Sequence, residues 1–203
     1  MKRITTELKE HVPFTALGAT SGIVILVIMV RLNVLADVSL TVFYVLHPLH
    51  VVLSAMVTSA LYRKYGNGKI WAVFLIGYFG SIGIATVSDS LIPYLGEILL
   101  DLPNREIHLG FIEEWQIVNP AAILGIAISF WKPTTKFPHF GHVFISTWAS
   151  AFHVIMALGA TISWVLILAI FVFLFLAVWL PCCLSDIVFP LLFTRKGLPL
   201  HDI

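Results

Sequence analysis

The chain has 203 residues, of which 59% are hydrophobic and 11% are charged, and its formal net charge is +1. Soluble domains carry about a quarter charged residues, so this composition, with a mean hydropathy of +0.98, predicts an integral membrane protein and leaves little chain for a soluble domain. The basic residues stand at the ends of apolar runs, where they orient a membrane protein, so no nucleic-acid partner is predicted.

The hydropathy pattern predicts an all-α protein with six membrane-spanning helices, because an apolar helix needs about 20 residues to cross a bilayer. No small-residue cleavage pattern follows the first apolar run, so it is interpreted as a retained helix rather than a signal peptide. The predicted spans are residues 13–30, 39–61, 70–95, 117–131, 137–158 and 162–193. The sixth is too long for one straight crossing and contains Pro181, so we expect a kink or tilt there.

The distribution of charge predicts how these spans are oriented. With six crossings, the clusters of Lys and Arg fall on one side of the membrane and the acidic segment 97–114 falls on the other. Basic loops favour the cytoplasmic side, so both termini are predicted to be cytoplasmic, in a plasma membrane or a bacterial inner membrane. Four tryptophans near the span ends agree with an aromatic belt: Trp71, Trp115, Trp131 and Trp164.

One pair of motifs occurs twice in the chain. His-x-x-His-Val-x-(Leu/Ile)-Ser begins at His47 and again at His139, and each copy is followed, one apolar segment later, by Ser-Asp-x-(Leu/Val)-x-Pro. Two matched elements in the same order indicate a duplicated unit. Because each unit has three crossings, the two would be inverted relative to each other, as in many secondary transporters. The predicted parts are a first repeat, an outer polar loop and a second repeat, at residues 1–96, 97–116 and 117–203.

Each repeat places one aspartate inside an apolar span, where an ionised carboxylate costs about 3 kcal/mol or more without a partner. No Lys or Arg lies at comparable depth, so histidine or a bound cation is the expected partner. Histidines three apart share a helix face, and two His nitrogens with one Asp oxygen suit zinc, iron or manganese. The predicted ligands are His47, His50 and Asp89 toward the outside and His139, His142 and Asp186 toward the inside. Further candidates for supporting or pathway roles are Ser54, Ser88, Ser146, His153 and Ser185.

Structural interpretations compete with this one. A His-x-x-His pair also occurs at helix starts and interfaces, and Asp89 and Asp186 could be packing groups bonded to Ser and His. Cys182 and Cys183 could bind a soft metal, although buried cysteines more often pack as small apolar residues. Small residues on the third span predict close packing of helices: Gly77, Gly80, Gly83 and Ala85.

The function predicted from these features is transport of a divalent metal cation through two repeat-related His-His-Asp sites, with the lipid bilayer and a small cation as partners. Proton coupling would use the same histidines, which titrate near neutral pH. One alternative is an intramembrane metal-dependent enzyme acting on a lipid. Another is a haem b protein in which His47 or His50 pairs with His142 or His153. The absence of an obvious extra nucleophile favours transport. The choice between a monomer and a homo-oligomer is left open.

Overall fold

A computed structural model describes the backbone of residues 2–32, 36–66, 69–131, 136–159, 162–183 and 189–193. Within these ranges every regular element is a helix, which confirms the predicted all-α class. The elements are α1 (Lys2–Arg31), α2 (Ala36–Tyr65), α3 (Ile70–Thr86), the π-helical segment η1 (Val87–Leu91), α4 (Ile92–Leu99), α5 (Gly110–Glu113), α6 (Trp115–Trp131), α7 (Lys136–Ala157), α8 (Trp164–Cys183) and α9 (Phe189–Leu192).

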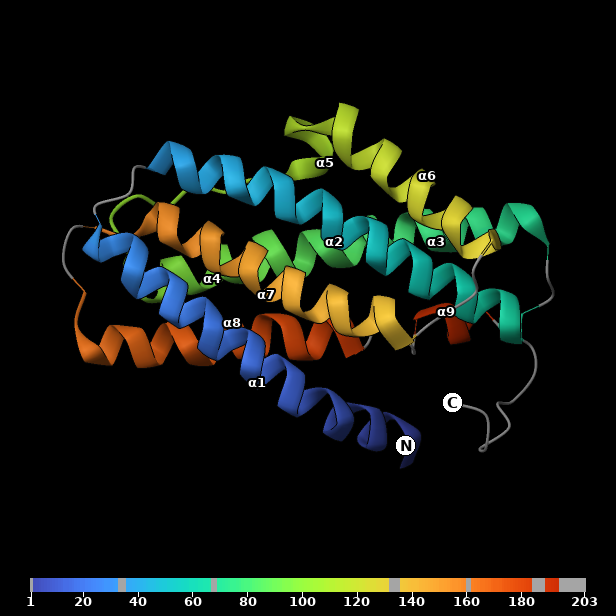
Figure 1. Cartoon of the computed structure of the whole chain (residues 1–203), viewed down its shortest axis with the longest axis horizontal. Helices are drawn as coiled ribbons and strands as arrows, with labels where there is room; N and C mark the ends of the chain where they lie inside the picture. The colour runs from blue at the N-terminus through green and yellow to red at the C-terminus, as the bar shows by residue number, and fades with distance from the viewer. Residues whose placement is uncertain are drawn as a thin grey trace.

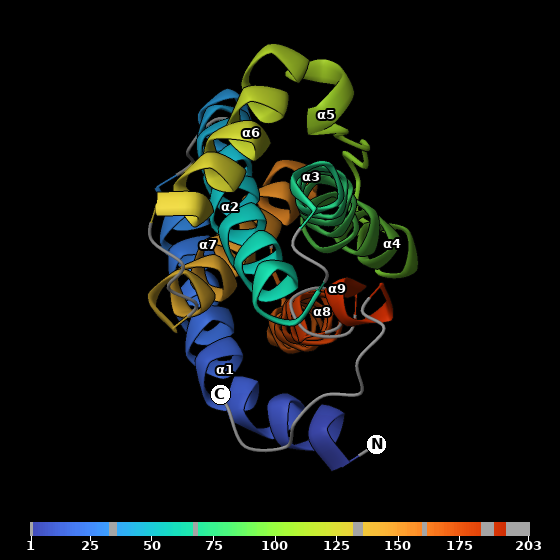
Figure 2. The same cartoon turned by 90° about the vertical axis from the view of Figure 1, so that its right-hand side faces the viewer.

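The helices form an elongated bundle with α7 at its centre (Figure 1). Seen along the bundle, α7 lies among α1, α2, α8 and the helix made by α3, η1 and α4, while α6 covers the far side of α2 (Figure 2). The colour gradient in Figure 1 shows that α2 and α7 run in opposite directions, and that α8 runs opposite to α3 and α4. A helix surrounded in this way can bury polar side chains that a lipid-facing helix cannot.

Four helices in the described part of the chain are long and apolar enough to cross a membrane: His11–Arg31, Val38–Tyr65, Ile70–Leu99 and Trp164–Cys182. The third of these is α3, η1 and α4 in continuous succession. Helix α6 is also apolar but has 17 residues. Large apolar side chains face outward along these helices, among them Val165 at 79% and Leu168 at 66% exposure. This surface suits a protein embedded in lipid.

The structure describes two parts of the sixth predicted span, residues 162–193. Helix α8 covers Trp164–Cys183 and the short helix α9 covers Phe189–Leu192, and the residues between them lie outside the described ranges. Pro181 lies in the last turn of α8. Proline has no N–H to bond the carbonyl four residues earlier, and its ring clashes with that carbonyl. Pro181 therefore removes one backbone hydrogen bond from the last turns of α8.

Glycines allow the helices around α2 to approach closely. A Cβ at Gly125 of α6 would lie 2.3 Å from the carbonyl oxygen of Val52, and one at Gly77 of α3 would lie 2.1 Å from Ser59 Oγ. A Cβ at Gly80 would also crowd its neighbours, whereas none lies within 4 Å at Gly83. The close packing predicted from the small residues is thus confirmed at Gly77 and Gly80.

The two ends of the bundle differ in charge. The acidic end carries segment 100–114, which crosses the end of α7: Asn104 donates from its backbone N–H to Ala157 O at 3.2 Å and from its side chain to Leu158 O at 3.1 Å. These bonds satisfy carbonyls that a helix end leaves without partners. The basic end carries Arg63, Lys64 and Lys69.

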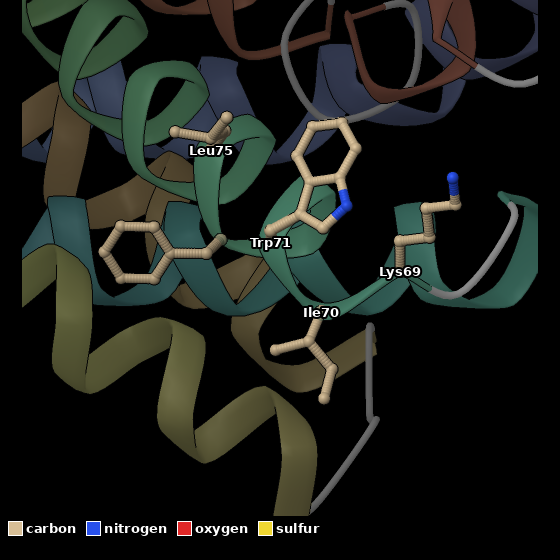
Figure 3. Close-up of a pocket in the computed structure, with 5 residues that line it drawn as sticks. Lys69, Ile70, Trp71 and Leu75 are labelled. Atoms are coloured by element: carbon tan, nitrogen blue, oxygen red, sulfur yellow. The ribbon is translucent and has the colours of Figure 1, made fainter.

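Tryptophans mark the helix ends, as an interfacial belt requires. Trp131 ends α6 and is 90% exposed, and Trp164 begins α8 and is 84% exposed. At the start of α3, Trp71 lies beside Lys69 in a shallow apolar surface hollow whose other lining residues are Ile70, Phe74 and Leu75 (Figure 3). The Lys69 ammonium lies 6.0 Å from the centre of the Trp71 ring. An aromatic ring and an ammonium at this level suit the boundary between lipid and water.

Candidate functional site

Two stripes of polar side chains meet inside the bundle. On α7 the stripe consists of His142, Ser146, Ser150 and His153, and on α2 it consists of His47, His50 and Ser54. Intervals of three and four residues keep each set on one helix face. All seven side chains are buried, at 0% or 1% exposure. Polar groups held away from water need partners, so the two stripes define a candidate site.

A π-helical segment presents Asp89 to both stripes. In η1 the N–H of Ile92 bonds to Val87 O, five residues back, rather than to Ser88 O. The next N–H in that register would come from residue 93, which is a proline and has none. The Ser88 carbonyl instead accepts a hydrogen bond from Ser150 Oγ at 2.9 Å. Single π-helical turns inside α-helices are frequent at functional sites.

The Asp89 carboxylate, which is fully buried, accepts hydrogen bonds from four side chains. Its Oδ2 lies 2.9 Å from His47 Nδ1 and 2.8 Å from His50 Nδ1. Its Oδ1 lies 2.7 Å from both Ser88 Oγ and Ser146 Oγ. Ser146 belongs to the second predicted repeat and the other three to the first, so residues of both halves meet at one carboxylate.

This arrangement determines which nitrogen of each histidine is available. An ionised carboxylate only accepts hydrogen bonds, so His47 and His50 each donate from Nδ1, and in the neutral ring Nε2 then carries the lone pair. Neither Nε2 has a hydrogen-bond partner among the described residues, although both are buried. A carboxylate that fixes a histidine through one ring nitrogen while the other faces a metal is the usual second layer of a metal site.

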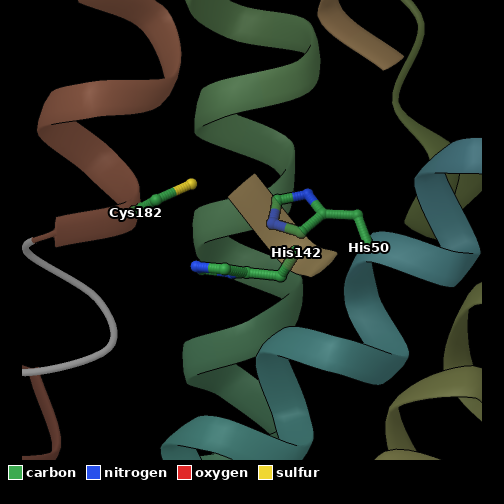
Figure 4. A group of neighbouring side chains, drawn as sticks. All are labelled: His50, His142 and Cys182. Atoms are coloured by element: carbon green, nitrogen blue, oxygen red, sulfur yellow. The ribbon is translucent and has the colours of Figure 1, made fainter. Parts of the chain in front are cut away.

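His50, His142 and Cys182 form a group that could hold a metal ion. Their potential ligand atoms all lie within 4.8 Å of one another, and all three side chains are buried. Figure 4 shows the three side chains converging from α2, α7 and α8. The rings of His50 and His142 are 5.5 Å apart between centroids, and Cys182 Sγ lies 3.8 Å from Ser146 Oγ. Two imidazoles and a thiol are ligands that Zn²⁺ accepts in proteins.

A second polar group lies toward the acidic end. His153 Nδ1 is 2.7 Å from Glu97 Oε1, and both side chains are buried. The pair lines a cavity of about 390 Å³ together with Asn104, Glu106 and His108. Glu97, the first residue of the predicted outer polar loop, lies in α4, which continues to Leu99, and its side chain is buried.

Glu113 attaches segment 100–114, which lies next to this cavity, to α2. It accepts hydrogen bonds from the Tyr44 hydroxyl, from the Leu109 N–H at 2.8 Å and from His108 Nδ1 at 3.2 Å. Burial acts to raise the pKa of Glu113, but these hydrogen bonds outweigh it, so the pKa lies below its ordinary value. Segment 100–114 is thus tied to α2 through an ionised carboxylate.

One aromatic ring separates the two polar groups. Phe43 is fully buried and stacks on His47 with ring centroids 5.4 Å apart and an interplanar angle of 14°. Its ring also meets His153 edge-on at 5.5 Å. On the other side of His47, a Cβ at Gly110 would lie 2.8 Å from Nε2, so α5 packs directly on that imidazole. The central cluster is closed toward the cavity by Phe43.

The predicted site residues fall into four groups. His47, His50, Ser88, Asp89, His142 and Ser146 lie together in the central cluster, and His153 lies in the cavity near the acidic end. Ser54 is buried, and its hydroxyl has no hydrogen-bond partner among the described residues. Three further candidates lie outside the described residues or have undescribed side chains: His139, Ser185 and Asp186.

Three residues of the site were not singled out from the sequence. Glu97 follows Asp89 by eight residues, two helical turns along the same face, and that spacing is a signal that could have linked them. Ser150 follows Ser146 by four residues on the polar stripe of α7. Phe43 precedes His47 by four residues but carries no chemical signal of its own.

Searches of protein-family models, curated proteins and solved structures find no match to this chain.

Proposed function

We propose that the protein transports a divalent transition-metal cation, zinc, iron or manganese, across a plasma membrane or a bacterial inner membrane. The observation that carries this proposal is the convergence of His50, His142 and Cys182, from three different helices, at the centre of the bundle. Helices that each contribute one ligand can close on an ion and release it when they move relative to one another. A thiolate among the ligands favours zinc or iron over manganese.

Asp89 supports such a site by orienting histidines. Its two oxygens accept hydrogen bonds from His47, His50, Ser88 and Ser146. Nε2 of each of these histidines has no hydrogen-bond partner among the described residues and could bind a metal. We therefore propose that Asp89 orients the histidine ligands and does not bind the metal itself. This modifies the sequence-based prediction, in which Asp89 is a ligand. Its negative charge would offset part of the charge of a bound cation in a medium of low dielectric constant.

The chain directions support an inverted repeat. Helices α2 and α7 carry the two His-x-x-His motifs and run oppositely, as do the helix of α3 and α4 and helix α8. Two oppositely oriented halves can exchange roles between states open to either side. On this proposal the six helices of the bundle cross the membrane, the basic end faces the cytoplasm, and both termini lie there. The second His-His-Asp set, with His139 and Asp186, remains a prediction.

One observation favours the alternative of an intramembrane metal-dependent enzyme acting on a lipid. Catalytic zinc sites have three protein ligands and an open fourth position for water or substrate, and the cluster offers three. The two proposals differ in what metal-loaded protein does in a vesicle, because one predicts metal flux and the other predicts lipid cleavage.

The first experiment measures metal in protein purified without a metal-binding tag and then adds Co²⁺ to the metal-free form. We expect one transition metal per chain and a thiolate-to-cobalt absorption band that disappears in Cys182→Ser and His142→Gln. The control variant is Cys183→Ser, which should keep the band. Retention of the band in Cys182→Ser, or no metal in any sample, would overturn the site. A Soret band in the same spectra would identify haem instead.

The second experiment reconstitutes the loaded protein in liposomes that contain a metal-sensitive dye. Metal entry that is lost in Cys182→Ser supports transport. Well-folded protein that binds metal but moves none under metal or proton gradients would overturn transport, and release of fatty acid or headgroup from the vesicle lipid would then establish the enzyme.

A further inference from the structure

The buried pair Glu97 and His153 has the features of a binding site for a second, smaller ion. The pair lines the cavity of about 390 Å³ near the acidic end, yet neither side chain is more than 1% exposed. Glu97 Oε2 and His153 Nε2 have no hydrogen-bond partner among the described residues. Each of these atoms can take a proton, and the bond between Nδ1 and Oε1 fixes both side chains in place.

A metal ion fits this pair less well than a proton does. Among the described residues, one group of three or more potential metal ligands has its ligand atoms within 4.8 Å of one another. That group is His50, His142 and Cys182. The pair therefore lacks a compact third ligand. An imidazole beside a carboxylate can instead gain and lose a proton, and neutralising a buried carboxylate removes the cost of holding it away from water.

The charged and titratable groups around the pair come from a small number of elements. Segment 100–114 contributes Glu106 and His108 to the cavity. The ring centroids of His108 and His153 are 5.5 Å apart. Behind His108 lie Glu113 of α5 and Tyr44 of α2. Other charged or titratable groups among the described residues at this end are Tyr94 of α4, Glu114, the exposed ion pair of Asp101 with Arg105, and Arg31 at the exposed end of α1. The described residues of α8 at this end carry no titratable side chain.

We propose that Glu97 and His153 bind the proton whose movement is coupled to metal transport, at a site separate from the metal ligands. This inference rests on the proposed transport function. The pair binds one proton from the cavity, its charge rises from −1 to 0, and no other bond is made or broken. Phe43 lies between His153 and His47, so proton and metal bind on opposite sides of one ring and do not compete for the same atoms.

The site can be tested without transport by pH-difference infrared spectroscopy of metal-free protein. We expect carboxylate and imidazole bands that change with pH, that are absent in Glu97→Gln and that persist in Glu106→Gln. Glutamine keeps an oxygen to accept the His153 Nδ1–H, so the fold should tolerate it. Glu106 lines the same cavity but is exposed, which makes its variant a matched control. Spectra of Glu97→Gln identical to wild type would overturn the proposal.

Coupling is then measured in liposomes under a pH gradient. With one proton exchanged per metal ion, a gradient of one pH unit shifts the equilibrium distribution of the metal about tenfold. We expect this shift in wild type and Glu106→Gln and its loss in Glu97→Gln, which should still move metal down a metal gradient. Wild-type protein that transports metal without any response to the pH gradient would overturn the coupling site and leave transport standing. Absence of metal flux in wild type would overturn transport, and with it the coupling.

Discussion

Asp89 is the residue on which the central cluster depends. It is fully buried, and four side chains from α2, η1 and α7 donate hydrogen bonds to it. Charge-assisted hydrogen bonds are stronger than neutral ones, and in lipid no water competes for the carboxylate. The same residue therefore joins three helices and sets the tautomer of His47 and His50.

The first prediction is that Asp89→Asn weakens metal binding about 10- to 100-fold, the usual effect of losing a group that orients a ligating histidine. Asparagine presents one oxygen and one NH₂ to four donors, so at least one donor on α2 or α7 loses its acceptor. We expect a loss of stability of about 1–3 kcal/mol as well. Zn²⁺ affinity and thermal unfolding in detergent measure the two effects.

Ser146→Ala is the control for this prediction, because it removes one hydroxyl donor and leaves both histidine bonds intact. It should lower metal affinity much less than Asp89→Asn does. Equal affinities in wild type and Asp89→Asn would show that the carboxylate does not orient the ligands.

At the scale of residues, the sequence predicts part of the site and misses part for physical reasons. The duplicated motif singled out His47, His50, Asp89, His142 and Ser146, which the structure brings together. Cys182 was considered as a soft-metal ligand, but a thiol in an apolar run more often packs like a small hydrophobic group, so its place beside two histidines depends on tertiary packing. Glu97 stands next to an acidic loop, and its burial depends on how far α4 continues.

At the scale of elements, η1 is stabilised from outside its own helix. The Ser88 carbonyl has no helical donor because residue 93 is a proline, and Ser150 of α7 supplies the missing hydrogen bond. The sequence shows the proline but not the π-helical register, since a helix can also end or kink before a proline. The π-helical register of η1 therefore depends on the hydrogen bond from Ser150 of the neighbouring helix α7.

The second prediction is a coupling between Ser150 and Pro93. Ser150→Ala leaves a buried carbonyl unpaired and should cost about 1–3 kcal/mol in the wild-type background. In Pro93→Ala the restored N–H can bond to Ser88 O, so the same change should cost less there. A double-mutant cycle on unfolding free energies should give an interaction energy of about 0.5–3 kcal/mol. Additive effects of the two changes would contradict this account of η1.

The third prediction concerns α5, which has four residues and depends on Glu113 for its attachment to α2. The pKa of Glu113 in the folded protein lies below its ordinary value of 4.5. A lowered pKa contributes stability that is fully present above about pH 4.5 and is lost as pH falls through the lower folded value. Hydrogen exchange of the Leu109 amide should therefore show less protection below pH 4.5 than expected from intrinsic rates.

Glu113→Gln tests this assignment. The variant should show weaker protection of Leu109 at neutral pH and little further change on acidification. Because Glu114 is a neighbouring half-buried carboxylate that makes none of these hydrogen bonds, Glu114→Gln should behave like wild type. Protection of Leu109 that does not respond to pH in wild type would show that the charge of Glu113 does not hold α5.

At the scale of the whole molecule, the two polar groups lie at different depths in one bundle. The cavity with Glu97 and His153 lies beneath the acidic segment, whereas His50, His142 and Cys182 lie farther along α2, α7 and α8. Overall hydropathy predicts helices suited to a membrane, and four of them meet the length and hydropathy that a crossing requires. Hydropathy does not predict that the two polar groups are separate, because one buried aromatic ring, Phe43, lies between them.

The last prediction is that Phe43→Ala opens a path from the acidic end to the central cluster. In a Cys183→Ser background, Cys182 should react slowly with a small water-soluble thiol reagent in the wild-type site, because it is 1% exposed. Without the ring, reagent added at the acidic end should label it several-fold faster, and bound Zn²⁺ should protect it.

Truncation of a buried phenylalanine costs about 3–5 kcal/mol, so labelling is measured well below the melting temperature. Phe43→Leu keeps most of the volume and is the matched control, expected to label only slightly faster than wild type. If the acceleration were equal with reagent at the basic end, loosened packing would explain it, whereas acceleration confined to the acidic end requires a path that Phe43 normally closes.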